Sequence, residues 1–265
     1  SREVAMGALG FTETGFLVFF LVLVRMTGLF IIAPVFAHAS VPAQVKAWFA
    51  FAVTLVVYPM VSQTPMSAPG EVAELAWMIA RELFVGFTLG YVALLLFAAA
   101  QYAGELIDTQ MGFGMANLVD PSFGAQVTVV GQFHFLAATM VYLAVNGHHF
   151  LVGALVRSYD VVPMGQVGLS PDLFDCVVLR FGELFKIAAR MALPAAICLL
   201  ITEMSLGIAA RAVPQMNVLM VGFPLKICVG LAVLVLAMPG FVGYVRVALG
   251  RLQEAIVLII GAMRS

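Results

Sequence analysis

The sequence predicts an all-α integral membrane protein. Hydrophobic residues make up 63% of the 265 residues and charged residues only 10%, whereas soluble domains are nearer half apolar and a quarter charged. Apolar runs long enough to cross the hydrocarbon core, which takes about 20 residues, recur along the chain. We expect about six hydrophobic helical segments, arranged as hairpins in a single domain over residues 1–265.

The first half of the chain contains three of these apolar segments. Acidic residues open the third one, which suits the positive end of a helix dipole. Within it, Gly86 and Gly90 lie one turn apart and allow close packing of a second helix. The segments are expected at 14–37, 47–61 and 72–103, separated by a turn at 38–46 and a proline-containing loop at 62–70.

The second half contains three more segments after a polar run. Charged residues interrupt the last two, which therefore fit best when protein rather than lipid surrounds them. Lys and Arg are spread evenly over the connections, so the positive-inside rule gives no orientation. The segments are expected at 126–146, 172–211 and 218–245, with an amphipathic piece to Tyr159, a loop at 160–171 and an amphipathic C-terminal tail.

The polar run between these halves, Gly104 to Pro121, is the most informative part of the chain. It reads GELIDTQMGFGMANLVDP and interrupts two long apolar segments. Such a break is costly in lipid, so we expect it to face a cavity or a partner protein. Its glycines permit a positive φ, its methionines are adaptable, and Asp120-Pro121 suits the restart of a helix. The candidate site residues are Gln110, Met111, Gly112, Phe113, Gly114, Met115, Asn117, Asp120 and Pro121, with the flanking acids Glu105 and Asp108.

Composition and motifs argue against several classes of function. The formal net charge is −1, whereas a nucleic-acid partner would require a basic surface. The sequence has no HExxH, GxSxG or P-loop motif, and only Asp108 and Asp120 could form an intramembrane acid pair. His148 and His149 are adjacent and make a poor metal pair on a helix. We therefore expect neither an enzyme nor a bound cofactor or metal.

Charges inside the apolar segments form a second set of candidates. Arg25 and Lys226 each lie within an apolar run and should face a partner or a water-filled cavity. Another group repeats at the spacing of one helix face and comprises Arg180, Glu183, Lys186 and Arg190. This stripe fits either a face at the level of the lipid headgroups or docking onto the charges of a neighbouring subunit.

A proton-coupled small-solute transporter is an alternative function. Charges at depth and a helix broken near Gly222-Phe223-Pro224 would suit it. The two halves of the chain show no clear inverted similarity, which weakens this alternative. His134 stands alone in an apolar run, and we expect it to hydrogen-bond a neighbouring helix rather than to relay protons.

The run from Ala103 to Pro121 resembles the signature of the FliR family of flagellar export-gate proteins. The matching pattern is A-G-E-L-I-D-x-Q-M-G-F-x-x-A-x-x-V-D-P. Its Gln-Met-Gly-Phe and Asp-Pro elements favour the flagellar branch over the SctT family of virulence secretion systems. Further matches follow in order, at Tyr142–His149, Val162–Gly165, Ala212–Gln215 and Val221–Leu225, together with Arg25, Ala33-Pro34 and Val41-Pro42.

This resemblance implies a core subunit of the flagellar type III protein export gate, needed for flagellum assembly. Members of the family form, with FliP and FliQ, a helical hetero-oligomer that conducts unfolded proteins. FlhB wraps the channel entrance and FlhA feeds it. The location would be the bacterial inner membrane, in the flagellar basal body, partly raised toward the periplasm.

The resemblance also implies roles for parts of the chain. Residues 1–160 would form a FliP-like part and 172–265 a FliQ-like hairpin. The segment 104–121 would be a plug in the channel. Apart from the resemblance, charges within apolar segments usually face partners, so we expect assembly contacts at Arg25, Arg180, Glu183, Lys186, Arg190 and Lys226.

Overall fold

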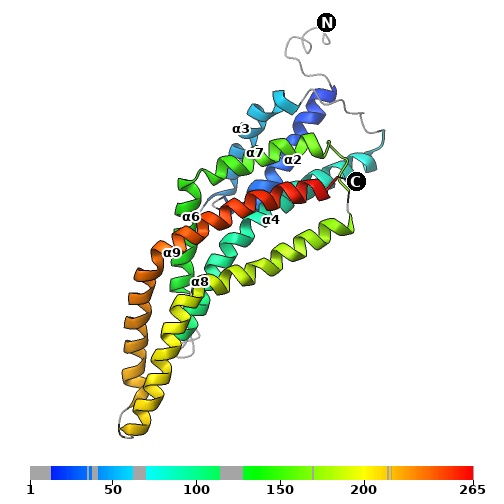
Figure 1. The fold of residues 1–265 in the computed structure, drawn as a ribbon. Coiled ribbons are helices and arrows are strands. Elements are labelled where there is room, and N and C mark those ends of the chain that lie inside the picture. Colours follow the sequence, from blue (N-terminus) through cyan, green and yellow to red (C-terminus); the bar gives the residue numbers. More distant parts are fainter. Residues whose placement is uncertain are drawn as a thin grey trace. The chain divides into compact units, whose positions relative to one another are not determined.

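The computed structural model describes residues 13–34, 36–37, 41–61, 70–113, 128–168, 170–213, 215 and 217–264. Within these ranges the chain is α-helical, apart from one isolated antiparallel bridge between Val167 and Arg264. The predicted all-α class is confirmed. The helices are α2 (Glu13–Ile32), α3 (Ala43–Val61), α4 (Val72–Met111), α6 (Val129–Ala144), α7 (Gly147–Val161), α8 (Pro171–Ala212) and α9 (Val218–Ala262) (Figure 1).

Five of these helices are long and apolar enough to cross a membrane, namely α2, α3, α4, α8 and α9. The pair α6 and α7 adds a further candidate if it is taken as one broken span. The break falls at Asn146, whose φ of 55° is the left-handed conformation that asparagine tolerates well. The predicted segment end at Asn146-Gly147 is therefore confirmed.

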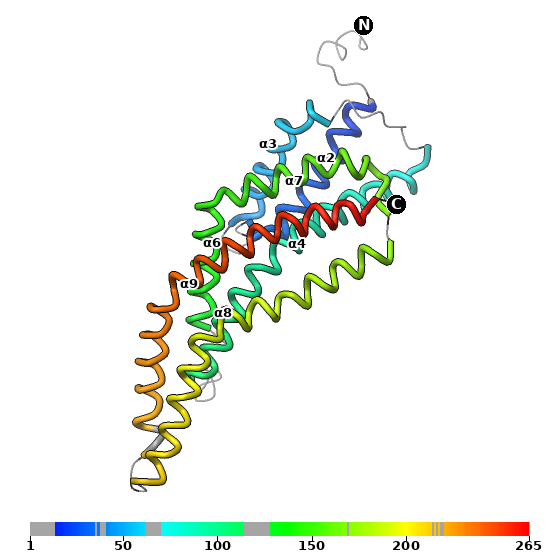
Figure 2. The backbone as a smooth tube through the Cα atoms, in the orientation of Figure 1, coloured from blue at the N-terminus to red at the C-terminus, as the bar shows by residue number. Residues whose placement is uncertain are grey.

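The chain divides into two compact units, which we describe separately. The first comprises residues 1–94, 146–180 and 251–265, and the second comprises 95–145 and 181–250. The long helices α4, α8 and α9 each contribute residues to both units. The course of the chain through these elements can be followed in Figure 2.

In the first unit, α2 packs against α3 and against the first part of α4. An aromatic cluster joins α2 to α3, with the Phe30 ring 4.9 Å from Phe36 and 5.0 Å from Phe49. The α2–α4 crossing depends on glycine. A Cβ atom on Gly86 would collide with the carbonyl oxygen of Arg25 and lie 2.9 Å from the Leu29 nitrogen. The close packing predicted at this glycine is confirmed.

In the second unit, the last turns of α4 pack against α6. Ala99, Ala100 and Ala103 have no exposed surface on this side of α4. The Phe97 ring meets Tyr142 edge-on at 5.3 Å. Small residues of α4, together with an aromatic pair that has one ring on each helix, thus mark the contact of α6 with the last turns of α4.

The second half of α8 and the first half of α9 complete the second unit. They lie side by side as an antiparallel hairpin (Figures 1 and 2). An ion pair joins the two arms, with Lys226 Nζ 3.2 Å from Glu203 Oε1. Lys226, predicted as an assembly contact, therefore already has a partner within the chain.

Several predicted boundaries were displaced. The helix α4 runs to Met111, so the predicted break at Gly104 was too early. The helix α9 continues to Ala262 over the predicted separate tail, and α2 ends at Ile32, before the predicted residue 37. The polar residues 105–110 remain helical, and among them Asp108 accepts hydrogen bonds from another helix, as shown below. The loop predicted at 62–69 and most of the polar run, residues 114–121, lie outside the described residues.

Gly86→Ala should destabilise the protein, because the new methyl group meets backbone atoms that cannot move aside. Overpacking of this kind costs about 1–3 kcal/mol. Gly182→Ala on α8 is the matched control, since nothing lies within 4 Å of its Cβ position and alanine favours a helix by up to about 1 kcal/mol. Thermal unfolding in detergent measures both variants. Equal melting temperatures would contradict the described crossing.

Candidate functional site: the frame of the polar segment

Asp108 joins the two helices that flank the polar segment. It lies near the end of α4, and its carboxylate accepts hydrogen bonds from the first amides of α6. Val130 N lies 3.0 Å from Oδ2 and 3.2 Å from Oδ1, and Gly131 N lies 3.2 Å from Oδ2. The start and the end of the segment between α4 and α6 are thus held at one place.

This contact supplies the N-terminal cap of α6. The first amides of a helix have no partner within the helix, and a nearby Ser, Thr, Asp or Asn usually accepts from them. Thr128 occupies the cap position but makes no side-chain cap hydrogen bond. The Asp108 side chain is 3% exposed and takes that role from another helix. Its negative charge also lies at the positive end of the α6 dipole, which is favourable.

A pair of glycines brings the backbones of α4 and α6 together beside this cap. A Cβ atom on Gly104 would lie 2.5 Å from the nitrogen and the Cα of Gly131. No larger residue fits at Gly104 while the helices remain this close, and a Cβ atom on Gly131 would lie 2.7 Å from Thr128 Oγ1 and 3.1 Å from the Gln101 carbonyl oxygen. Gly104 is therefore a packing residue inside α4 rather than the start of a break.

Met111 and Gly112 end α4 against α9. Met111 has no exposed surface, and a Cβ atom on Gly230 would lie 2.7 Å from its sulfur. Gly112 has a φ of 90°, and the Phe223 ring is only 2.6 Å from its Cβ position. Gly112 thus uses the positive φ that glycine permits, and the structure places Met111 in packing contact within the chain.

The remaining predicted residues of the segment divide into two groups. Glu105 and Gln110 are half-buried on α4, and Glu105 Oε1 lies 3.3 Å from Gln101 Nε2. Phe113 is half-buried directly after Gly112. The other predicted residues lie outside the described part of the chain and comprise Gly114, Met115, Asn117, Asp120 and Pro121.

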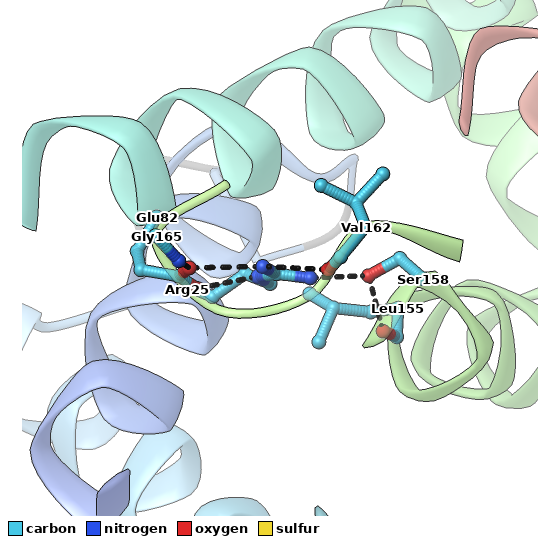
Figure 3. A network of polar contacts seen from close by, with 6 residues as sticks. All are labelled: Arg25, Glu82, Leu155, Ser158, Val162 and Gly165. Atoms are coloured by element: carbon cyan, nitrogen blue, oxygen red, sulfur yellow. Dashed lines mark hydrogen bonds and ion pairs between the residues drawn. The ribbon is translucent and has the colours of Figure 1, made fainter. Parts of the chain in front are cut away.

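A buried ion pair organises the first unit (Figure 3). Arg25 of α2 and Glu82 of α4 have no exposed side-chain surface. Arg25 Nε lies 2.6 Å from Glu82 Oε2, and Arg25 Nη2 lies 2.9 Å from Glu82 Oε1. The guanidinium also donates to Ser158 Oγ at 2.8 Å and lies over the Tyr159 ring at 3.9 Å. The pair thereby joins α2, α4 and α7.

The same pair holds the loop after α7. Gly165 N donates to Glu82 Oε1 at 2.8 Å, and Arg81 Nη1 donates to the Gly165 carbonyl at 2.6 Å. Gly165 has a φ of 70°, which favours glycine at this turn. Three residues later, Gly168 N donates to the Met263 carbonyl at 3.0 Å. The loop thus connects the buried pair to the C-terminal end of α9.

Arg25 was predicted as an assembly contact, and that role stays a prediction. The structure buries its side chain completely and pairs it with Glu82 of the same chain. Sequence reasoning identified Arg25 as a charge that needs a partner but missed Glu82. The available signal was that both residues carry charge beside long apolar stretches, where each is costly alone.

The other predicted polar residues do not join these two clusters. Arg180, Glu183, Lys186 and Arg190 lie along α8, with Lys186 and Arg190 exposed. His134 is buried, and its Nδ1 lies 2.9 Å from the Val130 carbonyl, so its hydrogen-bond partner is in its own helix rather than in a neighbouring one. Among the described residues, no group of three or more His, Cys, Asp or Glu side chains could hold a metal ion.

Comparisons with known proteins identify the family. A family model described as bacterial export proteins, family 1, matches residues 16–252. The flagellar biosynthetic protein FliR of Bacillus subtilis (strain 168) is 36% identical over 224 residues, which cover 83% of this chain and 85% of that protein. FliR of Aquifex aeolicus (strain VF5) is 31% identical over 78% of this chain and 79% of its own length. FliR of Escherichia coli (strain K12) is 29% identical over 83% and 84%. The resemblance read from the sequence is confirmed.

Arg25→Ala should strongly destabilise the chain, because it leaves Glu82 buried without its counter-charge. Breaking such a pair costs about 3–5 kcal/mol. Arg157→Ala is the matched control, since Arg157 is exposed and lies next to Ser158 on α7. Thermal unfolding and the yield of monodisperse protein in detergent measure the effect. A variant as stable as the control would show that the pair does not hold the first unit.

Asp108→Ala should loosen the start of α6, because the first amides of this helix lose their acceptor. A lost cap costs roughly 0.5–2 kcal/mol, so amide hydrogen exchange at Val130 and Gly131 should become faster. Thr109→Ala is the control, since its exposed hydroxyl donates only to the Leu106 carbonyl. Hydrogen-exchange mass spectrometry of the peptide that begins at Thr128 gives the readout. Unchanged exchange in Asp108→Ala would refute the cap.

Proposed function

The chain belongs to the bacterial export proteins of family 1, and we propose that it serves as a membrane subunit of the flagellar protein export gate. One observation carries this proposal. Relatives named flagellar biosynthetic protein FliR match this chain over most of their own length and at up to 36% identity. The several apolar helices of the fold suit a subunit that is embedded in a membrane.

We propose that the chain works in an assembly with FliP and FliQ, with FlhB and FlhA at the entrance of the channel. The exposure of its helices supports partners of this kind. In α9 only 17% of the most apolar window is buried within the chain, and in α3 only 22%. Apolar surface of this extent must be covered by lipid or by other subunits. The bacterial inner membrane, in the flagellar basal body and partly raised toward the periplasm, is the location that fits such an assembly.

The polar segment after Met111 is the proposed plug of the channel. Its two ends are held together by the Asp108 cap and by the Gly104–Gly131 contact. A segment closed at its base in this way can block a pore without depending on the rest of the chain for its position. We propose that residues 112–121 prevent ion leakage and move aside when an unfolded substrate passes.

The charged stripe on α8 is the proposed surface for other subunits. Lys186 is exposed, and Arg180 and Glu183 are half-exposed on the same side of the helix. Arg25 contributes to assembly through the fold of the first unit rather than by contact. Passage of a polypeptide through a channel requires no covalent chemistry in this chain, so the proposed role is not enzymatic.

Deleting residues 114–120 should raise the ion conductance of the assembled gate while leaving assembly intact. The deletion lies outside Met111, Gly112 and Thr128, so the packing of α4 and α6 is retained. The chain is co-expressed with FliP and FliQ and purified as a complex, and its conductance is measured in planar bilayers. Wild-type conductance in an intact complex would refute the plug.

Co-purification in the same experiment is the control for the gate itself. Failure of the wild-type chain to co-purify with FliP and FliQ would contradict the proposed assembly. Solute uptake by the wild-type chain alone in liposomes would instead support the transporter alternative.

A further inference from the structure

The second unit contains a cavity that the proposed gate function leaves unexplained. Its volume is about 310 Å³, and it lies between α8 and α9. Its lining includes Pro194 of α8, Phe241 and Tyr244 of α9, Ile107 of α4 and His134 of α6. An apolar cavity of about 150 Å³ is large enough to hold benzene, so this one can hold a segment of a hydrocarbon chain.

Prolines lie at the level of this cavity in both helices. Pro194 lies inside α8, and Pro239 lies inside α9 next to lining residue Gly240. A proline within a helix removes one backbone hydrogen bond, and its ring displaces the preceding turn. The cavity lies where these prolines interrupt the regular helical ladder, and the Lys226–Glu203 ion pair joins the same two helices.

Arg190 is the cationic residue among those that line the cavity. Its side chain is exposed at the rim, and within the described residues no hydrogen bond or ion pair engages its guanidinium. An unpaired cation beside an apolar cavity between membrane helices is complementary to an amphiphile with an anionic head. Basic pockets between transmembrane helices bind acidic lipid headgroups in this way.

Two of the lining residues, His134 and Tyr244, add polar groups to the site. A carbonyl only accepts hydrogen bonds, so His134 Nδ1 donates to the Val130 carbonyl. In the neutral ring Nε2 is then an acceptor, and among the described residues it has no hydrogen-bond partner. Tyr244, which also lines the cavity, carries a hydroxyl group. These groups suit the hydroxyl and ester groups near a lipid headgroup, whereas the other walls suit an acyl chain.

We propose that this cavity binds one acyl chain of an anionic phospholipid, with the phosphate at Arg190. This assignment separates Arg190 from the rest of the charged stripe on α8, which faces other subunits in the proposed assembly. It concerns lipid binding and does not require that the polar segment act as a plug.

Site-specific fluorescence quenching tests the proposal. Trp48 and Trp77 are the two tryptophans of the chain and are replaced by phenylalanine, and Tyr244→Trp places a probe in the cavity wall. The full chain, together with the subunits that accompany it, is purified in detergent and titrated with phosphatidylglycerol that carries brominated acyl chains. Phosphatidylcholine with the same chains is the comparison. We expect quenching of the probe at about fivefold lower concentrations of phosphatidylglycerol, the effect of one arginine near an anionic headgroup.

Two pairs of variants locate the effect. Arg190→Gln should remove the preference for phosphatidylglycerol, whereas Arg246→Gln, an exposed cation of α9 outside the cavity, should retain it. Ala237→Phe places a ring at a lining residue and should weaken quenching by both lipids. Ala232→Phe, at an exposed residue of α9 that is not among the lining residues, should leave quenching unchanged.

Three results would overturn the proposal. Equal quenching by the two lipids would show that no anionic head is recognised. An unchanged preference in Arg190→Gln would place the headgroup elsewhere. No quenching in the purified assembly would show that a protein subunit rather than a lipid covers the cavity.

Discussion

The buried pair of Arg25 and Glu82 is the constraint around which the first unit is built. Neither charge is tolerable alone in an apolar interior, so each fixes the position of the other. The carboxylate of Glu82 also receives the Gly165 amide, and the guanidinium reaches Ser158. One ion pair thereby determines where α2, the first part of α4, the end of α7 and the following loop lie. A pair of this kind contributes little net stability compared with apolar residues, but it excludes alternative arrangements that would leave a charge unpaired.

The second unit meets the same requirement with a hydrogen-bonded cap. The carboxylate of Asp108 is desolvated, and backbone amides of Val130 and Gly131 compensate for the lost water. Glycine at positions 104 and 131 permits the close approach that brings these groups together. Polar groups and small residues therefore act jointly, since the cap requires the close approach and the close approach leaves no room for water.

The sequence was sufficient for the fold class and the long helices. The length of the apolar runs is a local property, and it carries both predictions alone. The sequence was insufficient where a residue depends on a distant partner. Gly104 and Asp108 resemble the start of a loop until Gly131 and the amides of α6 are known to face them. Arg25 resembles an interface residue until Glu82, far away in the chain, is known to meet it. The register between helices is a tertiary property that no local pattern contains, and the predicted residues 114–121 remain predictions.

The position of the cap limits how the polar segment can move. Separating Asp108 from α6 would leave a carboxylate and two amides without partners in an apolar environment, which is costly. The glycine contact between α4 and α6 has no side chains that could rotate to accommodate a shift. Rearrangement inside the segment requires neither change, and Gly112 already adopts a backbone conformation that glycine leaves at little cost. A displacement during export should therefore begin after Gly112 and end before Thr128. In the proposed plug role, the Asp108 cap and the glycine contact would hold α4 and α6 together at the base of the segment throughout this displacement.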